Sequence, residues 1–282
     1  MYAAKNRGKA QYEVYKPGMN TRAVKRLDLD RDLCRAVERE EIEVHYQPVI
    51  EMDTGEINGF EALARWRHPE RGLIPAAEFL MFAEETGLIR PIGQLVIEEA
   101  CQQAREWRER YPDRSLSMSV NLSASEFSRQ PDLIPNVLNQ TWLNPGDLQL
   151  EITERAVMDD AEFYLGKLHM LRGLGVSFAI DDFGMGYSCL YYLKRMPVDH
   201  LKIDHTFITG LGEGDLGDEA IVSGTIGLGY ALGLRVVAEG VESEEQLAKL
   251  GEMDCDLAQG YYFAKPLPSE VANSLLEGDA SS

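Results

Sequence analysis

Apolar and polar positions along the chain alternate between two patterns. From Val44 onward, short runs rich in β-branched and apolar side chains are separated by longer segments with helical spacing of their apolar residues. Strands that alternate with helices favour an α/β architecture. The expected strands are Val44–Ile50, Ile57–Leu63, Leu116–Asn121, Leu148–Ile152, Val176–Asp181, His200–Ile203, Arg235–Glu239 and Asp256–Tyr261.

Eight expected strands in 282 residues indicate a closed, TIM-like (β/α)8 barrel, a fold that uses about 250 residues. Only residues 51–56 separate the first two strands. A parallel connection needs a crossover of a dozen or more residues, whereas a short loop makes an antiparallel hairpin. We therefore expect one strand of the barrel to run against the others.

Helix-start signals occur in the gaps between later strands. Ser123 with Glu126, and Ser243 with Gln246, match the spacing of a capping box. Pro75 stands where a first helical turn is expected. These signals support helices as the connections between the parallel strands.

The chain divides unevenly along its length. Residues 1–18 read as a short helix, a turn and a strand, which is too little to bury a core of its own. We expect them to be the remnant of a preceding domain. Residues 19–40 are expected to be a linker, and the segment Thr21–Glu41 an amphipathic helix with Leu27, Leu33, Ala36 and Val37 on one face. The barrel domain is expected at 41–275 and a disordered tail at 276–282.

Charge and apolar length exclude two classes of partner. The net charge of −19 argues against binding of DNA or RNA, because polynucleotide affinity rests on many Lys and Arg contacts to phosphate. The longest uncharged apolar stretch, Ile221–Leu234, is too short to cross a bilayer, which takes about 20 residues. We expect a buried helix there and no membrane segment in this chain. Four scattered cysteines without metal-ligand spacing are typical of a reducing, cytoplasmic setting (Cys34, Cys101, Cys189 and Cys255).

Polar side chains stand at the carboxyl end of almost every expected strand. In a parallel barrel these ends form one rim, which is where active sites of such barrels are built. The residues expected at the rim are Glu61, Asn121, Glu151, Asp181, Asp182, Lys202, Asp204, Glu239 and Gln259. Clustered carboxylates repel one another and require a positive charge. An all-oxygen ligand set suits Mg²⁺ or Mn²⁺, and the adjacent Asp181 and Asp182 could bridge two ions about 3.5–4 Å apart.

Each rim residue also has an ordinary structural explanation. Asp181 and Asp182 could form a turn with a helix cap, Asn121 could cap the helix expected after it, and Lys202 could pair with Asp204. The convergence of so many polar side chains on one end of the barrel favours a functional site. The five histidines share no ligand spacing, and we assign them no catalytic role.

Several short motifs together give a resemblance to a known family. Residues from about 40 to 270 resemble an EAL domain, the cyclic di-GMP phosphodiesterase module named after a tripeptide that stands here at 61–63. The motifs that carry the resemblance are YQP (46–48), EALARW (61–66), VNLS (120–123), LEITE (150–154), DDFG (181–184), KID (202–204), AEGVE (238–242) and QGYYFAKPLP (259–268).

The resemblance implies a barrel with one antiparallel strand, two Mg²⁺ or Mn²⁺ ions, and hydrolysis of cyclic di-GMP to linear pGpG. It implies a first metal held by Glu61, Asn121, Glu151 and Asp181, and a second organised by Asp181, Asp182 and Asp204. Lys202 matches a lysine that positions the attacking water, Glu239 matches a metal ligand or general base, and Glu154 matches a residue that braces the loop after Asp182. The positions matching substrate contacts are Gln47, Glu61, Leu63, Arg65, Asp182, Glu242 and Gln259.

The resemblance extends to partners. The run MYAAKNRG (1–8) followed by a strand resembles the C-terminal end of a GGDEF domain, which implies a GGDEF-like domain ahead of this one in a longer protein. It also implies a homodimer formed through the loop after Asp182 and the helix that follows. That loop departs from the family pattern, because Met185 replaces a small residue and Cys189 a serine. We expect these changes to tune activity and not to abolish it.

Two other functions remain open from the residues alone. The domain could be a non-catalytic receptor for the dinucleotide, although such members lack several carboxylates or the lysine and none is missing here. An unrelated barrel enzyme could use Lys202 as a Schiff base. A nearby Asp204 would keep that lysine protonated, which opposes the depressed pKa such an amine needs.

Overall fold

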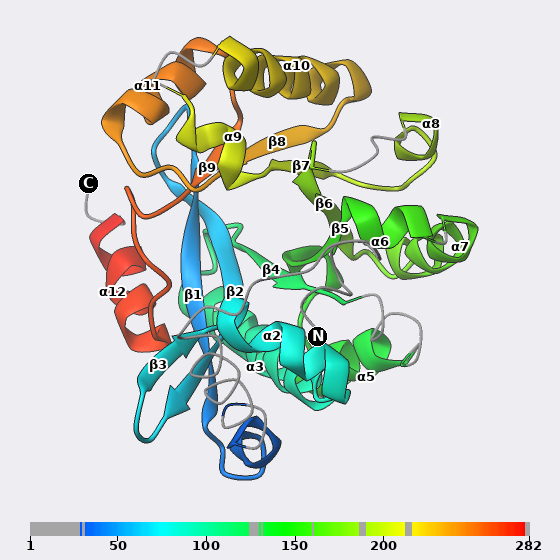
Figure 1. The fold of residues 1–282 in the computed structure, drawn as a ribbon, viewed down its shortest axis with the longest axis vertical. Coiled ribbons are helices and arrows are strands. Elements are labelled where there is room, and N and C mark those ends of the chain that lie inside the picture. The colour runs from blue at the N-terminus through cyan, green and yellow to red at the C-terminus, as the bar shows by residue number, and fades with distance from the viewer. Residues whose placement is uncertain are drawn as a thin grey trace, which may run out of the picture.

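The computed structural model describes residues 29, 32–123, 130, 132–159, 161–185, 190–211 and 216–279. Its centre is a closed barrel of strands with helices packed around the outside (Figure 1). The strands are β1 Ile42–Glu51, β2 Ile57–His68, β3 Gly72–Pro75, β4 Ser117–Asn121, β5 Leu148–Thr153, β6 Ser177–Phe183, β7 His200–Ile203, β8 Arg235–Glu239 and β9 Leu257–Gln259.

The barrel closes through β1, which runs against its neighbours. The order around the sheet is β1-β9-β8-β7-β6-β5-β4-β2-β3, with β1 also paired to β2. β1 pairs antiparallel with both β2 and β9, and the pairs from β2–β4 round to β8–β9 are parallel. The prediction of an eight-stranded TIM-like barrel with one reversed strand is confirmed. β3 is an additional strand that extends β2 as a hairpin outside the closed ring.

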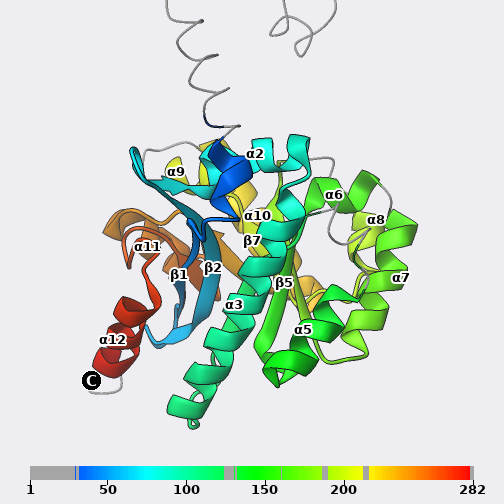
Figure 2. The same ribbon diagram turned by 90° about the horizontal axis from the view of Figure 1, so that it is seen from below.

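Helices cover the outer surface of the barrel. In Figure 2, α3 runs along the strands beside α5, and in Figure 1 α12 lies next to β1. The helices are α2 Ala76–Thr86, α3 Ile89–Arg110, α5 Leu133–Thr141, the 3₁₀ turn η1 Pro145–Asp147, α6 Glu154–Asp159, α7 Ala161–Arg172, α8 Leu190–Leu193, α9 His205–Thr209, α10 Leu216–Leu232, α11 Glu244–Glu252 and α12 Ser269–Asp279.

The apolar core lies between the strands and this helical layer. Trp107 of α3 packs edge-on against Tyr46 of β1 and tilted against Phe60 of β2, with ring centroids 5.1 and 4.4 Å apart. Its indole Nε1 donates to Oδ1 of Asn273 at 2.6 Å, which ties α3 to α12. Such aromatic pairs contribute about 1 kcal/mol each beyond the area they bury. They hold β1 in place although it pairs with β9 over only a short ladder.

Alternation along the strands places a second set of side chains inside the barrel. Its lower layer joins a small apolar cluster to a polar chain in which Ser119 donates to Gln149 at 2.8 Å and the Gln149 amide lies 2.5 Å from Nδ1 of His200. Two residues further toward the rim on each of these strands, the interior position carries a polar residue in every case. The residues of this upper layer are Gln47, Asn121, Glu151, Lys202, Glu239 and Gln259. In the same strand order, the lower-layer residues beneath them are Val49, Ser119, Gln149, His200, Val237 and Leu257.

Several local expectations are met. Ser243 and Gln246 form a complete capping box at α11, and Pro75 directly precedes α2. Within the helix expected at Thr21–Glu41, residues 29 and 32–36 are helical, and both Leu33 and Ala36 are buried; residues 37–40 form a turn, so the helix ends earlier than predicted. Residues 1–28, including Leu27, and Glu126 of the other capping box lie outside the described residues.

Other expectations are wrong. The hairpin strand β3 was not predicted. α10 is not a buried helix, since Ile221 is 40% exposed and Tyr230 is 89% exposed, and only one face of the helix packs on the barrel. The tail expected to be disordered from residue 276 instead continues α12 to Asp279, with Leu276 fully buried.

Two findings concern the whole described part of the chain. No helix among the described residues is long and apolar enough to cross a membrane. Cys34, Cys101 and Cys255 are free thiols, of which the last two are buried; Cys189 lies outside the described residues.

Candidate active site

The ammonium group of Lys202 lies at the centre of the upper layer. Its Nζ is 2.5 Å from Oε2 of Glu151 and 2.5 Å from Oε1 of Glu239, with Oε2 of Glu61 at 3.4 Å and Oδ1 of Asp181 at 3.7 Å. These carboxylates come from β5, β8, β2 and β6, so the side chains of four strands meet at one lysine from β7. The predicted convergence of rim residues is therefore present in the structure.

Glu61 anchors a second set of contacts made by neutral amides. Asn121 Nδ2 donates to its Oε1 at 2.6 Å, and Gln259 Nε2 donates to its Oε2 at 2.7 Å. Gln259 Nε2 also lies 3.2 Å from Oε1 of Gln47, whose own Nε2 donates to the backbone oxygen of Ala264 at 3.0 Å. The amides fix the orientation of the Glu61 carboxylate without adding charge, and they connect it to β1 and β9.

A bulge at the end of β6 presents two adjacent aspartates. The register between β6 and β7 shifts between Ile180 and Phe183, and Asp182 adopts a left-handed backbone with φ of 54°. A bulge places extra residues on one strand and turns their side chains, and a positive φ at a non-glycine residue costs about 1 kcal/mol or more. Asp181 thereby faces Lys202, while the Asp182 and Asp204 carboxyl groups share a hydrogen bond.

The electrostatics of the cluster show an excess of negative charge. Burial raises the pKa of Glu151 well above its usual range, and the nearby Glu61 adds to that increase. Burial likewise raises the pKa of Asp182 to about 6, helped by Asp181, and that of Glu239 to about 8. For Glu61, burial raises the pKa but the Lys202 charge and the amide donors more than offset it. One ammonium does not neutralise all these carboxylates.

The same carboxylates keep Lys202 charged. Burial alone would lower the pKa of its ammonium, but Asp181, Glu151, Glu239 and Glu61 together raise it well above the usual value. A Schiff-base lysine needs a depressed pKa, so this environment opposes that chemistry. From the sequence, Asp204 was expected to be the neighbour that keeps Lys202 protonated. The structure instead shows the ion pairs described above, and Asp204 accepts hydrogen bonds from Thr206.

Glu154 connects the rim to the loop after Asp182. The backbone N–H of Gly184 donates to Glu154 Oε2 at 3.3 Å, and Gly184 has φ of 98°, which favours glycine. Met185, the residue that departs from the family pattern, is 59% exposed. Its Sδ lies 3.4 Å from Oγ1 of Thr206. Residues 186–189, including Cys189, lie outside the described residues.

The donor set fits divalent cations. In the part of the chain that the structure describes, no group of three or more His, Cys, Asp or Glu side chains is arranged to hold a metal ion as it stands. The residues are nevertheless of the right kind, because carboxylate and amide oxygens are the ligands preferred by Mg²⁺ and Mn²⁺. The raised pKa values of Glu151, Asp182 and Glu239 also mark a place where added positive charge would be stabilised.

Three of the expected substrate contacts lie at the margin of this cluster. Arg65 is half-buried on β2 and donates from Nη1 to the Ala64 oxygen. Burial lowers the pKa of its guanidinium, against the effect of Tyr261 and Glu61. Leu63 lies opposite His45 in the β1–β2 ladder, and Glu242 is exposed after β8. No role was predicted for His45, although it stands two residues before Gln47, so both side chains lie on one face of β1.

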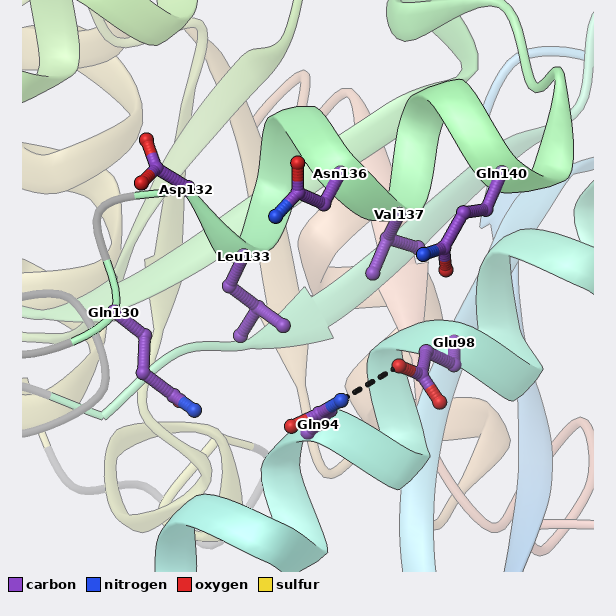
Figure 3. Close-up of a pocket in the computed structure, with 8 residues that line it drawn as sticks. All are labelled: Gln94, Glu98, Gln130, Asp132, Leu133, Asn136, Val137 and Gln140. Carbon is purple, nitrogen blue, oxygen red and sulfur yellow. Dashed lines mark hydrogen bonds between the residues drawn. The ribbon is translucent and has the colours of Figure 1, made fainter.

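A separate hollow opens between α3 and α5. It has a volume of about 340 Å³ and is lined by amide and acidic side chains such as Gln94, Glu98 and Gln140 (Figure 3). Gln94 Nε2 donates to Glu98 Oε1 at 2.8 Å across one turn of α3. None of the predicted site residues lines this hollow.

The fold and rim define a class of protein: a TIM-like barrel with one reversed strand and a lysine surrounded by carboxylates at its C-terminal end. Residues 30–266 match the model of the EAL domain. The chain belongs to the EAL-domain family, the family of cyclic di-GMP phosphodiesterases.

Known relatives and solved structures agree with this assignment. The chain is 44% identical over 272 residues to the bifunctional diguanylate cyclase/cyclic di-GMP phosphodiesterase MucR of Pseudomonas aeruginosa, and 37% identical over 271 residues to the cyclic di-GMP phosphodiesterase PdeR of Escherichia coli. These matches cover 96% and 95% of this chain but only 39% and 40% of those proteins. The chain thus spans less than half the length of these relatives.

Among solved structures, the PaMucR phosphodiesterase in complex with c-di-GMP matches with a TM-score of 0.84 and 44% identity. That match covers 87% of this chain and 99% of the other. An EAL-domain protein from Listeria monocytogenes matches with a TM-score of 0.73 and 32% identity, covering 85% and 94% of the two chains.

Proposed function

We propose that this domain hydrolyses one phosphodiester bond of cyclic di-GMP to give linear pGpG, with two Mg²⁺ or Mn²⁺ ions as cofactors. The observation that carries the proposal is a buried lysine surrounded by Glu61, Glu151, Asp181 and Glu239, with the amides of Asn121 and Gln259 bonded to Glu61. The similarity to MucR and PdeR supports the choice of substrate.

The residues that would hold the ions are those with hard oxygen donors at the rim. One ion would be held by Glu61, Asn121, Glu151 and Asp181. The other would be held by Asp181, Asp182 and Asp204. Glu239 lies 2.5 Å from the Lys202 ammonium; burial raises its pKa and the nearby Asp181 charge adds to that increase. When bound, two such ions polarise the phosphate and lower the pKa of water.

The protein's own groups then position the reactants. Lys202, held by carboxylates on several sides, donates hydrogen bonds toward the water oxygen and the phosphate. That oxygen bonds to phosphorus, the bond from phosphorus to the 3′ oxygen breaks, and the 3′ oxygen gains a proton. Glu239, whose pKa burial raises, lies beside Lys202 and would accept the proton from water, because proton transfer is most efficient when the pKa of the base lies near the working pH.

Substrate binding falls to the residues around this centre. Gln47 and Gln259 present amides beside Glu61. Burial lowers the pKa of the Arg65 guanidinium, and the charges of Tyr261 and Glu61 oppose that decrease, so Arg65 lies near enough to contribute a cation. Leu63, Asp182 and Glu242 are proposed as further contacts. Glu154 braces the loop that carries Gly184.

We further propose that this domain works within a larger cytoplasmic protein, behind a GGDEF-like domain whose C-terminal remnant is residues 1–18. The limited share of MucR and PdeR that the chain covers supports this proposal. We also propose a homodimer through the loop after Asp182 and α8, because Leu190 and Tyr191 of α8 are 55% and 65% exposed. Sedimentation of the domain at micromolar concentration tests the dimer.

Product analysis tests the activity. The protein is incubated with cyclic di-GMP and Mg²⁺ or Mn²⁺, and nucleotides are separated by chromatography. We expect linear pGpG that disappears with chelator and in Glu61→Ala. Binding of the dinucleotide without turnover under both metals would instead identify a receptor.

A further inference from the structure

The barrel seam between β1 and β9 is closed in two different ways. At its lower end the strands pair directly, Ile50 with Ala258 and Glu51 with Leu257. Toward the rim no further β1–β9 pairs follow among the described residues. Instead the chain leaves β9 as residues 260–267, here called the strap, and returns to β1 where Tyr46 and Leu267 exchange backbone hydrogen bonds of 2.7 and 2.9 Å.

Three consecutive residues of β1 hold the strap. His45 Nδ1 lies 3.2 Å from the Pro266 oxygen, the Tyr46 backbone pairs with Leu267, and Gln47 Nε2 donates to the Ala264 oxygen. Gln47 Oε1 in turn accepts from Gln259, which also donates to Glu61. The position of the strap therefore fixes which way the Gln47 amide faces, and through it the Gln259 amide.

His45 is fixed at both ends of its ring. It is 5% exposed, and its Nε2 lies 2.8 Å from Oε1 of Glu43. A carbonyl oxygen only accepts hydrogen bonds, so the contact with Pro266 is a hydrogen bond when Nδ1 carries the hydrogen. Glu43 is itself held by Arg67, whose Nε and Nη2 donate to it at 2.7 and 2.9 Å. The ring thus joins a braced carboxylate on β1 to the strap.

We propose that His45 is a positioning residue for nucleotide binding: by donating from Nδ1 to Pro266 it latches the strap onto β1 and so aligns Gln47 and Gln259 toward the substrate. This inference rests on the proposed function, since Gln47 and Gln259 are proposed substrate contacts. His45 acts on affinity and not on the bond-breaking step, because its contacts lie on the strap side and it makes none with Lys202 or Glu239.

Three substitutions separate the two ring contacts. His45→Asn retains a donor near Nδ1, His45→Gln retains one near Nε2, and His45→Leu removes both. Hydrogen exchange followed by mass spectrometry reports the strap amides, including Leu267, without any need for activity. Steady-state kinetics with cyclic di-GMP and Mn²⁺ report KM and kcat. Arg67→Gln is the matched control, because it alters the same cluster without touching the strap.

We expect faster strap exchange and a KM raised about tenfold in His45→Leu and His45→Gln, with kcat within about twofold of wild type. His45→Asn and Arg67→Gln are expected to resemble wild type in both measurements. A misplacement on the scale of an ångström is enough for effects of this size.

The inference is overturned if His45→Gln and His45→Asn behave alike, if strap exchange is unchanged in His45→Leu, or if kcat falls as much as KM rises. If strap exchange differs between wild type and the variants as expected but wild-type protein produces no pGpG, the result counts against the proposed function alone, since the exchange data still test the contact between His45 and the strap.

Discussion

Lys202 Nζ lies 2.5 Å from Glu151 Oε2, and each of the two side chains is only 2% exposed. A fully buried ion pair of this kind is costly to break, because removing one partner leaves the other charge uncompensated away from water. Here the lysine has several such partners, so its charge supports the whole upper layer of the barrel as well as the proposed chemistry.

Replacing the lysine should therefore affect stability in a pH-dependent way. In Lys202→Met we expect the free energy of unfolding at pH 7 to fall by about 3–5 kcal/mol. The loss should be smaller at pH 5, because burial raises the pKa of Glu61 once the Lys202 charge that lowers it is gone, so that Glu61 binds a proton there and needs no cation. Denaturant unfolding in the presence of chelator measures both values.

The control for this experiment is Lys249→Met, which removes an ammonium from a half-exposed pair with Glu219 on the barrel exterior. It should cost much less and show little pH dependence, since exposed ion pairs contribute little. A loss for Lys202→Met that is the same at both pH values would contradict the electrostatic account of the layer.

His200 gives a second pH effect, one layer below. Burial lowers its pKa to about 4, with the Arg235 charge adding to the shift, and its Nδ1 accepts from the Gln149 amide. Because the folded pKa lies below the unfolded value of about 6.5, this group's contribution is present above pH 6.5 and is lost as the pH falls toward 4. We expect a loss of roughly 2 kcal/mol over that window.

The contribution of His200 is isolated by comparison with His200→Asn, which keeps an acceptor near Nδ1 but cannot bind a proton in this range. The stability difference between wild type and variant, measured by denaturant titration from pH 7 to pH 4, should shift in favour of the variant at low pH. A constant difference across the window would show that His200 stays neutral or is already charged.

Glu154 should act through the loop it contacts. Glu154→Ala removes the acceptor for the Gly184 N–H, and we expect kcat/KM for cyclic di-GMP to fall about tenfold because the loop is less well placed. Glu154→Gln keeps an acceptor and should recover to within about threefold of wild type. Equal losses in the two variants would show that the negative charge matters more than the hydrogen bond.

The metal fit can be tested without turnover. Ions that bind only the folded state stabilise it, so Mn²⁺ at about 100-fold its dissociation constant should raise the melting temperature by about 5 °C. The increase should be much reduced in Glu61→Gln, which weakens the proposed ligand set, and it should reverse on adding chelator. An equal increase in wild type and Glu61→Gln would place the bound ion elsewhere.

Much of the site could be predicted because strand ends in a parallel barrel are periodic. Once β5 and β7 are identified, alternation places Glu151 and Lys202 on the same interior face, and the short 51–56 connection dictates the reversed strand. Contacts could not be predicted in the same way. The lysine contacts Glu151 and Glu239 from other strands instead of its sequence neighbour Asp204, because barrel closure decides which side chains meet.

The expectations that failed share a different cause. α10 looked buried because Ile221–Leu234 carries no charge and is mostly apolar, yet only one face of the helix packs on the barrel and Tyr230 is left exposed. β3 escaped notice because its four residues carry no alternation of their own and are held by the edge of β2. The latch at His45 depends on the return of residues 260–267 to β1, a long-range contact that no local pattern encodes.

The central claim is that water attacks a phosphodiester of cyclic di-GMP at this rim. Incubation with cyclic di-GMP and Mn²⁺ in ¹⁸O-labelled water, followed by mass spectrometry of the product, tests it most directly. The account predicts pGpG carrying one ¹⁸O in its terminal phosphate, formed by wild type and lost in Lys202→Met. Cyclic di-GMP that stays intact in the presence of wild-type protein, or a product without the label, would contradict it.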